Sequence, residues 1–173
     1  MSLEELGRFI AEFIRENREW ALPIVFLLAF GECLAFVSFL IPATVIFGVF
    51  GTAAGGAGLN PLPLAMAAAG GSILGFWVSL WLGHVWGPEA RHRWPFTRWP
   101  ALWDKGLAFF QKWGWASIFL AHFQGQLRPF LPLFAGIYGM NPLHFHAANI
   151  SASVLWAVMT FYGTNLLGQQ LAN

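Results

Sequence analysis

Charged side chains divide the sequence into short charged segments and long apolar ones. Residues 33–87 contain no Asp, Glu, Lys or Arg. At about 20 residues per spanning helix, this run is too long for one membrane crossing. Pro42 and a Gly-, Asn- and Pro-rich loop at 52–63 interrupt it. The pattern predicts a broken apolar segment over 20–57, followed by an unbroken spanning helix over 61–85.

The second half of the chain has the same kind of pattern. Residues 113–140 are apolar again, but Gly125, Pro129 and Pro132 interrupt them. An unbroken apolar stretch over 143–168 follows and is long enough to cross a bilayer. We therefore predict a second broken segment and a second spanning helix.

Each broken segment is preceded by an amphipathic stretch. In residues 1–19 and 88–112, apolar side chains recur at helical spacing, which is typical of helices lying at a membrane surface. The apolar positions are Leu6, Phe9, Ile10, Phe13 and Ile14 in the first stretch, and Trp99, Trp103, Leu107 and Phe110 in the second. Residues 88–112 carry five basic and two acidic side chains, which favours a cytoplasmic position for this stretch.

The order of elements, and part of the sequence, occurs twice. GLNPL at 58–62 resembles GMNPL at 139–143, and the same offset aligns Ser72 with Ser153. If each broken segment is a re-entrant hairpin, each half crosses the membrane once, and the two halves must be inverted relative to each other. We expect one all-α integral membrane domain over 1–173, an inverted repeat of amphipathic helix, re-entrant helical hairpin and transmembrane helix. The first repeat is 1–87, with its hairpin at 20–57, and the second is 88–173, with its hairpin at 113–140.

Composition supports a membrane protein and excludes several other classes. Hydrophobic residues make up 57% of the chain and charged residues 10%, against about 25% charged in soluble domains. A soluble enzyme, a disordered chain and a nucleic-acid binder are excluded on this basis. The composition predicts a multi-pass membrane protein. Cys33 is the only cysteine, so the chain cannot form an internal disulfide.

Two charged residues stand apart from the rest. Fifteen of the seventeen Asp, Glu, Lys and Arg residues lie in 1–19 and 88–112, and the remaining two are Glu32 and Arg128. Each lies on a broken segment, where an ionisable group costs about 2.5–3.5 kcal/mol to insert and usually marks a functional site. The alternative is a structural ion pair that joins the two segments.

The residues around Arg128 favour an anion site. Pro129 and Pro132 prevent a continuous helix there, and a guanidinium group suits phosphate or carboxylate. Further candidate binding groups are His122, Gln124 and Gln126. We expect Glu32 to neutralise Arg128 when no anion is bound, or to carry a proton. Asn149, Ser151 and Ser153 either line the site or bond neighbouring helices, and Trp156 is interpreted as a packing residue.

No sequence motif indicates catalysis or a cofactor. His144 and His146 are two positions apart and fall on different helix faces, so we expect no metal site. No nucleophile elbow, zinc-protease motif or phosphate-binding loop is present in the sequence. The chain is therefore not expected to be an enzyme. Small-residue helix faces would permit a homodimer.

The motifs resemble those of the DedA family, also called SNARE-associated or VTT-domain membrane proteins. Glu32 matches the family's first Glu, and Pro42 with Gly51 matches its first hairpin. GSILGFWVSLWLG at 71–83 resembles its glycine pattern. The second signature is matched by Arg128, Pro132, Ala135 and Gly136.

The chain departs from the family pattern at four places. Thr44 stands at the family's second acidic position, His122 at its first Arg, Gly125-Gln126 at its Pro-Gly and Phe76 at an Asp. A proton-coupling role of that second acid therefore cannot be transferred to this chain.

The resemblance implies lipid translocation by a flippase or scramblase. The implied cargo is undecaprenyl phosphate or a phospholipid, with Arg128 binding the phosphate, Thr44 in the same site and Glu32 gating it. Two alternatives remain. One is a proton-coupled transporter of small ions or drugs, and the other is a membrane assembly factor without transport.

Overall fold

Helices make up nearly all of the structure, a computed structural model that describes residues 12, 16–34, 43–56, 58–94, 96–125 and 127–172. No strand occurs in these residues. In chain order the elements are α2 (Arg18–Cys33), α3 (Ala43–Gly56), α4 (Leu62–Trp86), the 3-10 helix η2 (Gly87–His92), α5 (Pro100–Trp113), α6 (Ala116–Ala121), α7 (Leu131–Ile137) and α8 (Pro142–Ala172). Most of the predicted surface helix over 1–19, and the break at Pro42, lie outside the described residues.

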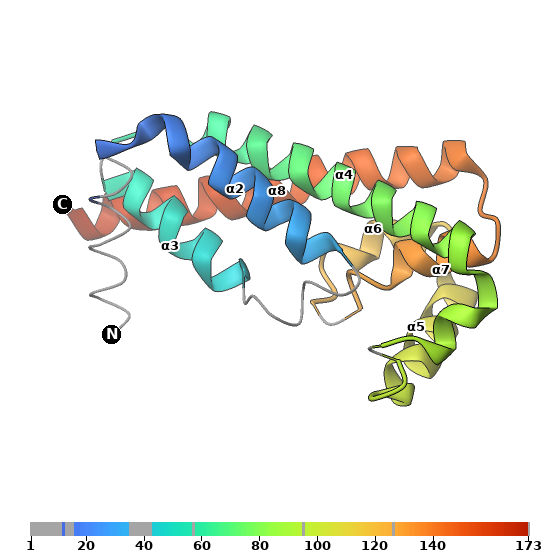
Figure 1. Ribbon diagram of the computed structural model, residues 1–173. Helices are drawn as coiled ribbons and strands as arrows, with labels where there is room; N and C mark the ends of the chain where they lie inside the picture. Colours follow the sequence, from blue (N-terminus) through green and yellow to red (C-terminus); the bar gives the residue numbers. More distant parts are fainter. Residues whose placement is uncertain are drawn as a thin grey trace.

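Two long helices, α4 and α8, run in opposite directions through the molecule (Figure 1). By length and apolar composition, two helical stretches among the described residues could cross a membrane, Leu62–His92 and Pro142–Leu171. Both long helices start in the same way: Asn60 Oδ1 accepts a hydrogen bond from the Leu62 N–H at 2.9 Å, and Asn141 Oδ1 accepts one from the Leu143 N–H at 2.8 Å. The N-P sequence thus explains where both helices begin.

The shorter apolar helices flank the long ones from opposite ends. In Figure 1, α2 lies along the first half of α4 and α3 lies along the C-terminal half of α8, whereas α6 and α7 lie at the other end of the bundle. Small residues allow close packing between them. A Cβ atom on Gly71 of α4 would collide with the Phe26 carbonyl oxygen of α2, and one on Gly55 of α3 would collide with the Asn165 carbonyl oxygen of α8.

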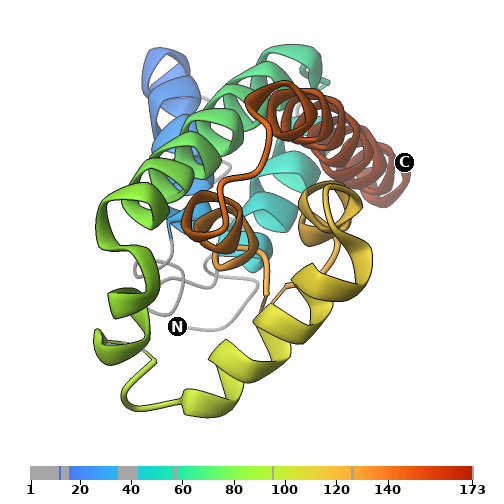
Figure 2. The same cartoon turned by 90° about the vertical axis from the view of Figure 1, so that its right-hand side faces the viewer.

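The segment predicted as one amphipathic helix over 88–112 is divided in two. The 3-10 helix η2 ends at His92, and α5 starts at Pro100, a residue that favours the first turn of a helix. The apolar stripe of α5 packs against α7: the Trp103 and Phe134 rings are 4.9 Å apart, and the Phe110 and Phe134 rings 6.4 Å apart. The η2–α5 segment projects sideways from the bundle (Figure 2).

Buried apolar residues form two clusters, one toward each end of the bundle. The first joins α2 and α3 to the start of α4 and the second half of α8, with Phe47 and Phe161 fully buried. The second joins the end of α4 to η2, α5, α6, α7 and the start of α8, with Phe130 and Phe134 fully buried. Along α4 and α8, the buried hydroxyls of Ser72 and Ser153 lie between the two clusters. The buried polar groups therefore meet in the middle of the molecule.

Candidate functional site

Glu32 and Arg128 lie where helices end. Glu32 is the penultimate residue of α2, and Arg128 lies between α6 and α7. The helices α6 and α7 have six and seven residues, or lengths of roughly 9 and 10 Å, so neither can cross a bilayer core of about 30 Å. The Gln124 carbonyl accepts hydrogen bonds from the Leu127 and Arg128 N–H groups, both at 2.9 Å, and this turn fixes the backbone that carries Arg128.

The two charged side chains form a buried ion pair. Arg128 Nη1 donates to Glu32 Oε2 at 3.2 Å, and the side chains are 4% and 13% exposed. They are 96 positions apart in the sequence. Ionised groups removed from water need a partner, and here each sign supplies the partner of the other. The structure therefore brings together the two residues that charge position alone singled out.

Two further side chains hold the guanidinium group of Arg128. Nη2 donates to Ser72 Oγ of α4 at 3.2 Å, and the guanidinium carbon lies 4.0 Å from the ring centroid of Trp156 of α8. The Nε atom is buried and has no hydrogen-bond partner within the described part of the chain. Arg128 is thus oriented by three helices, while its Nε–H donates to no group among the described residues.

Ser72 belongs to a network of buried polar groups. Its Oγ lies 3.2 Å from His122 Nε2, 3.3 Å from Cys33 Sγ and 3.3 Å from Ser153 Oγ. Ser153 Oγ also lies 3.2 Å from Asn149 Oδ1. The network joins α2, α4, α8 and the end of α6 around one arginine.

The contacts of His122 indicate which ring nitrogen carries the proton. Nδ1 lies 3.3 Å from the Ile118 carbonyl oxygen, which can only accept, so Nδ1–H is the donor. In the neutral ring Nε2 then accepts, and Ser153 Oγ lies 2.8 Å from it. The ring centroid of Phe76 is 4.3 Å away and covers the imidazole. A neutral His122 is therefore a buried donor at Nδ1 and a buried acceptor at Nε2.

The other predicted site residues lie in or beside the same helices. The backbone of Thr44 is in α3, but its side chain, like all of Gln126, lies outside the described residues. The side chain of Gln124 is exposed, and the contact it makes here is through its backbone carbonyl. Pro129 is buried beside Arg128, and Pro132 lies in the first turn of α7, where no N–H is needed.

The remaining two predicted hairpin residues are buried glycines at helix contacts. Gly51 of α3 faces Thr164 of α8, and Gly136 of α7 faces Leu80 and Gly83 of α4. In both cases a Cβ atom would collide with the facing helix. These glycines therefore position the short helices and do not themselves touch the ion pair.

Sequence reasoning missed two residues that contact Arg128 directly. From the sequence, Ser72 is notable only as a small residue that aligns with Ser153, and Trp156 is predicted to be a packing residue. The offset of 81 positions that aligns Ser72 with Ser153 was the available signal, because the two hydroxyls are in contact. Trp156 is one of 10 Trp residues, so its position carried no comparable signal.

No group of three or more His, Cys, Asp or Glu side chains within the described ranges could hold a metal ion. The ring of His144 lies 6.3 Å from that of Trp115, and the ring of His146 lies 5.5 Å from that of Phe145. These two histidines lie on α8 away from the ion pair, and their contacts are with aromatic rings.

The fold and the buried pair define an all-helical membrane protein. A family model described as the VTT domain matches residues 41–166. The chain is 31% identical to inner membrane protein YabI of Escherichia coli over 160 residues, which cover 92% of the chain and 63% of YabI. The chain therefore belongs to the VTT-domain family of membrane proteins, the DedA family.

Two other relatives show similar coverage of the chain. Protein DedA of Escherichia coli is 28% identical over 167 residues, which cover 92% of the chain and 74% of DedA. An uncharacterised membrane protein of Buchnera aphidicola is 26% identical over 155 residues, which cover 89% of the chain and 60% of that protein. The chain thus spans little more than three fifths of YabI and of the Buchnera protein. No solved structure matches the chain.

Proposed function

We propose that the chain is a membrane lipid transporter, a flippase or scramblase, that moves a phosphate-bearing lipid such as undecaprenyl phosphate or a phospholipid. The observation that carries this proposal is the buried guanidinium of Arg128, which is paired with Glu32 and retains an unused Nε–H. An arginine held at one orientation, with a donor to spare, is suited to a tetrahedral oxyanion.

In this mechanism the Glu32 carboxylate binds the Arg128 guanidinium whenever no lipid phosphate is bound there. When a head group reaches Arg128, its oxygens replace the Glu32 carboxylate on Nη1 and engage the unused Nε–H. Glu32 then needs another partner or a proton, because an unpaired carboxylate is costly in an apolar interior. Departure of the lipid restores the ion pair. Competition for one guanidinium thus gates the site, and protons are a second proposed partner.

An inverted repeat would place the two hairpins on opposite sides of this site. Several contacts recur 81 positions apart and support it. The Leu59 N–H bonds the Ala54 carbonyl, as the Met140 N–H bonds the Ala135 carbonyl, both at 2.9 Å. Gly55 meets α8 at Asn165, as Gly136 meets α4 at His84. The contact between Ser72 and Ser153, which are matched positions, is expected where a two-fold axis passes.

The remaining parts of the proposal concern the membrane in which the protein lies, catalysis and oligomeric state. A multi-pass position in the bacterial inner membrane is supported by the relative YabI, which is named an inner membrane protein, and by the two apolar helices α4 and α8. We propose no catalytic step and assign the buried polar groups around Arg128 the role of binding and orienting the head group. A homodimer remains compatible with this scheme.

Transport by purified protein in proteoliposomes tests the proposal. We expect R128A to slow translocation of a fluorescent phospholipid, and of undecaprenyl phosphate, at least tenfold, because the phosphate loses its fork-shaped partner. R128K keeps the charge without the fork and should be intermediate. R98A, which removes an exposed arginine on the loop before α5, is the matched control and should transport normally.

Loss of folding must be separated from loss of transport, because removing one partner of a buried pair costs about 3–5 kcal/mol. The neutral pair E32Q/R128M leaves no unpaired charge, so it should fold and still fail to transport. Wild-type lipid transport by folded R128A or by this double variant would contradict the proposal. Uptake of a small ion or drug that is driven by a pH gradient, without lipid transport, would indicate the proton-coupled transporter. Function that survives the charge swap E32R/R128E would indicate the membrane assembly factor.

A further inference from the structure

The η2–α5 segment carries a second set of cations that the central site does not use. Between Gly87 and Trp113 the sequence has five Lys or Arg and two Asp or Glu, all on exposed residues. One acidic residue is already engaged, since Arg91 and Asp104 form an ion pair at 3.7 Å with both side chains more than half exposed. The segment is therefore a net basic surface outside the bundle.

This segment is held firmly to the bundle by its inner side. The rings of Phe96 and Trp103 are 4.9 Å apart, and that of Phe96 lies 5.0 Å from Phe130, beside the turn that carries Arg128. Gly106 of α5 allows the ring of Phe134 to pack directly on the helix backbone. The inner aromatic residues are buried, so the opposite side of the segment must face outward.

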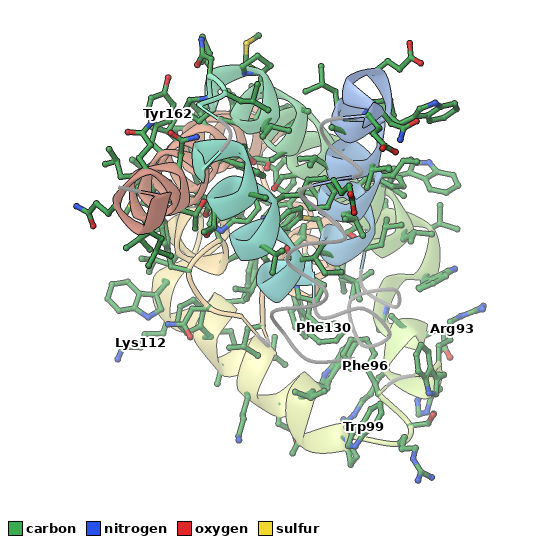
Figure 3. All side chains as sticks on the ribbon, turned by 90° about the vertical axis from the view of Figure 1, so that its left-hand side faces the viewer. Arg93, Phe96, Trp99, Lys112, Phe130 and Tyr162 are labelled. Carbon is green, nitrogen blue, oxygen red and sulfur yellow. The ribbon has the colours of Figure 1, made fainter. Side chains whose placement is uncertain are left out.

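The outward side combines tryptophan with cations. We call it the basic aromatic edge and define it as Arg93, Trp94, Trp99, Lys112 and Trp113. Its three tryptophans are 41–46% exposed. Figure 3 shows Arg93, Trp99 and Lys112 pointing away from the bundle, with Phe96 and Phe130 on the inner side.

Both cations of the edge are placed by aromatic rings. The Arg93 guanidinium lies 5.1 Å from the centroid of the Trp86 ring, and Lys112 Nζ lies 5.5 Å from that of Trp113. A cation–π contact uses the face of the ring and leaves the N–H donors available to an acceptor. Tryptophan is enriched at the depth of lipid head groups, so the cations lie where phosphate oxygens are found in a membrane.

We propose that the basic aromatic edge binds the head groups of anionic phospholipids in the leaflet that it faces. A net anionic lipid complements the net basic segment, whereas a zwitterionic lipid brings its own cation and offers no net attraction. Arg93 follows η2 and Lys112 lies in the last turn of α5, a helix roughly 21 Å long, and Figure 3 shows the two side chains on opposite sides of the segment, so we assign them to separate lipids. The contributions of Arg93 and Lys112 to the binding of anionic lipid should then be independent.

Native mass spectrometry of the full chain tests this in mixed micelles of phosphatidylglycerol and phosphatidylcholine at equal concentration. We expect the wild type to retain phosphatidylglycerol preferentially. R93Q and K112Q should each lower the ratio of bound phosphatidylglycerol to phosphatidylcholine about fivefold, the factor that corresponds to about 1 kcal/mol per basic residue. The double variant should lower it by the product, roughly 25-fold.

Two controls make the outcome decisive. E89Q removes an exposed acid from the same segment and should keep or raise the preference. E32Q/R128M removes the central ion pair without leaving an unpaired charge, so a phosphatidylglycerol preference that it retains belongs to the edge, and failure of the transport proposal and failure of this one are distinguishable. The inference is overturned if R93Q/K112Q keeps the wild-type ratio, or if E32Q/R128M alone removes the preference, which would place the bound lipid in the central site.

Discussion

Ser72 is the residue on which the polar contacts of the site converge. Arg128, His122, Cys33 and Ser153 all approach its single oxygen within 3.2–3.3 Å. A hydroxyl has one proton to donate and two lone pairs to accept with, so these contacts cannot all be hydrogen bonds at once. Arg128 can only donate to Ser72, which leaves the hydroxyl proton for His122 or Cys33. The orientation of one hydroxyl is therefore linked to the arginine.

We predict that S72A lowers the free energy of unfolding by about 2 kcal/mol, because a buried arginine donor and a histidine acceptor lose a partner. S79A is the matched control on the same helix. Ser79 is also fully buried, but its hydroxyl donates only to the Cys33 carbonyl at 3.0 Å, so the loss should be about 0.6 kcal/mol. Denaturant titration in detergent measures both. Equal losses in the two variants would contradict the central position of Ser72.

At the scale of helices, backbone contact between short and long elements determines the architecture. Gly83 of α4 and Gly136 of α7 face each other, and a Cβ atom on either would collide with a backbone carbonyl of the other helix. Gly168 of α8 faces Thr52 of α3 in the same way. Such small-residue contacts hold helices together where lipid provides no hydrophobic drive. They also fix the depth to which each short helix enters.

We predict that G136A destabilises the protein by about 1–3 kcal/mol, the usual cost of forcing an extra carbon into a packed contact. G163A on α8 is the matched control, since nothing lies within 4 Å of the position its Cβ would take. Alanine is the better helix former there, so G163A should be neutral or stabilising. Thermal unfolding in detergent gives both values. A stable G136A protein would mean that α7 can move away from α4.

The helices were predictable from sequence where the pattern was strong. The spanning segments expected at 61–85 and 143–168 correspond to α4 and to α8, which runs four residues further, to Ala172. The sequence predicts a single helix over 88–112, and the structure has η2 and α5 there instead. The apolar spacing from Trp99 onward gives no information about the 3-10 turn before it. Glu32 and Arg128 could be found because charge is costly in an apolar run. Ser72 had only its match to Ser153 as a signal, and Trp156 had none, since neither type is unusual in a membrane helix.

For the molecule as a whole, polarity is arranged in layers. Two apolar clusters enclose a buried polar centre, and most charged side chains are kept to the η2–α5 segment and to residues before α2. This distribution matches the water, lipid and water layers of a membrane only if the η2–α5 segment lies at one boundary. The proposed inverted repeat then puts the start of α2 and the end of α8 at the other boundary.

We predict that residues near α5 and near the C-terminus are accessible from opposite sides. The sole cysteine, Cys33, is buried, so C33S provides a background for single labelling cysteines at Thr97 and Gln169. An impermeant thiol reagent applied to intact cells should label the protein with cysteine at 169 and not the one at 97, because the basic segment favours the cytoplasm. Labelling of both cysteines from outside would place residues 97 and 169 on the same side and would contradict the proposed topology.

The separation of Glu32 and Arg128 by 96 positions has a consequence for biosynthesis. At about 5–20 residues per second, a ribosome makes Glu32 roughly 5 to 20 seconds before Arg128. During that interval α2 carries a carboxyl group whose partner has not been synthesised. Gly71 and Gly75 allow α2 to pack on α4 before then, but the polar centre cannot close until the second broken segment has entered. The ion pair therefore forms only after the second broken segment has been made, while α8 is still to follow, and a truncated chain that ends before α6 would lack the arginine that pairs with Glu32.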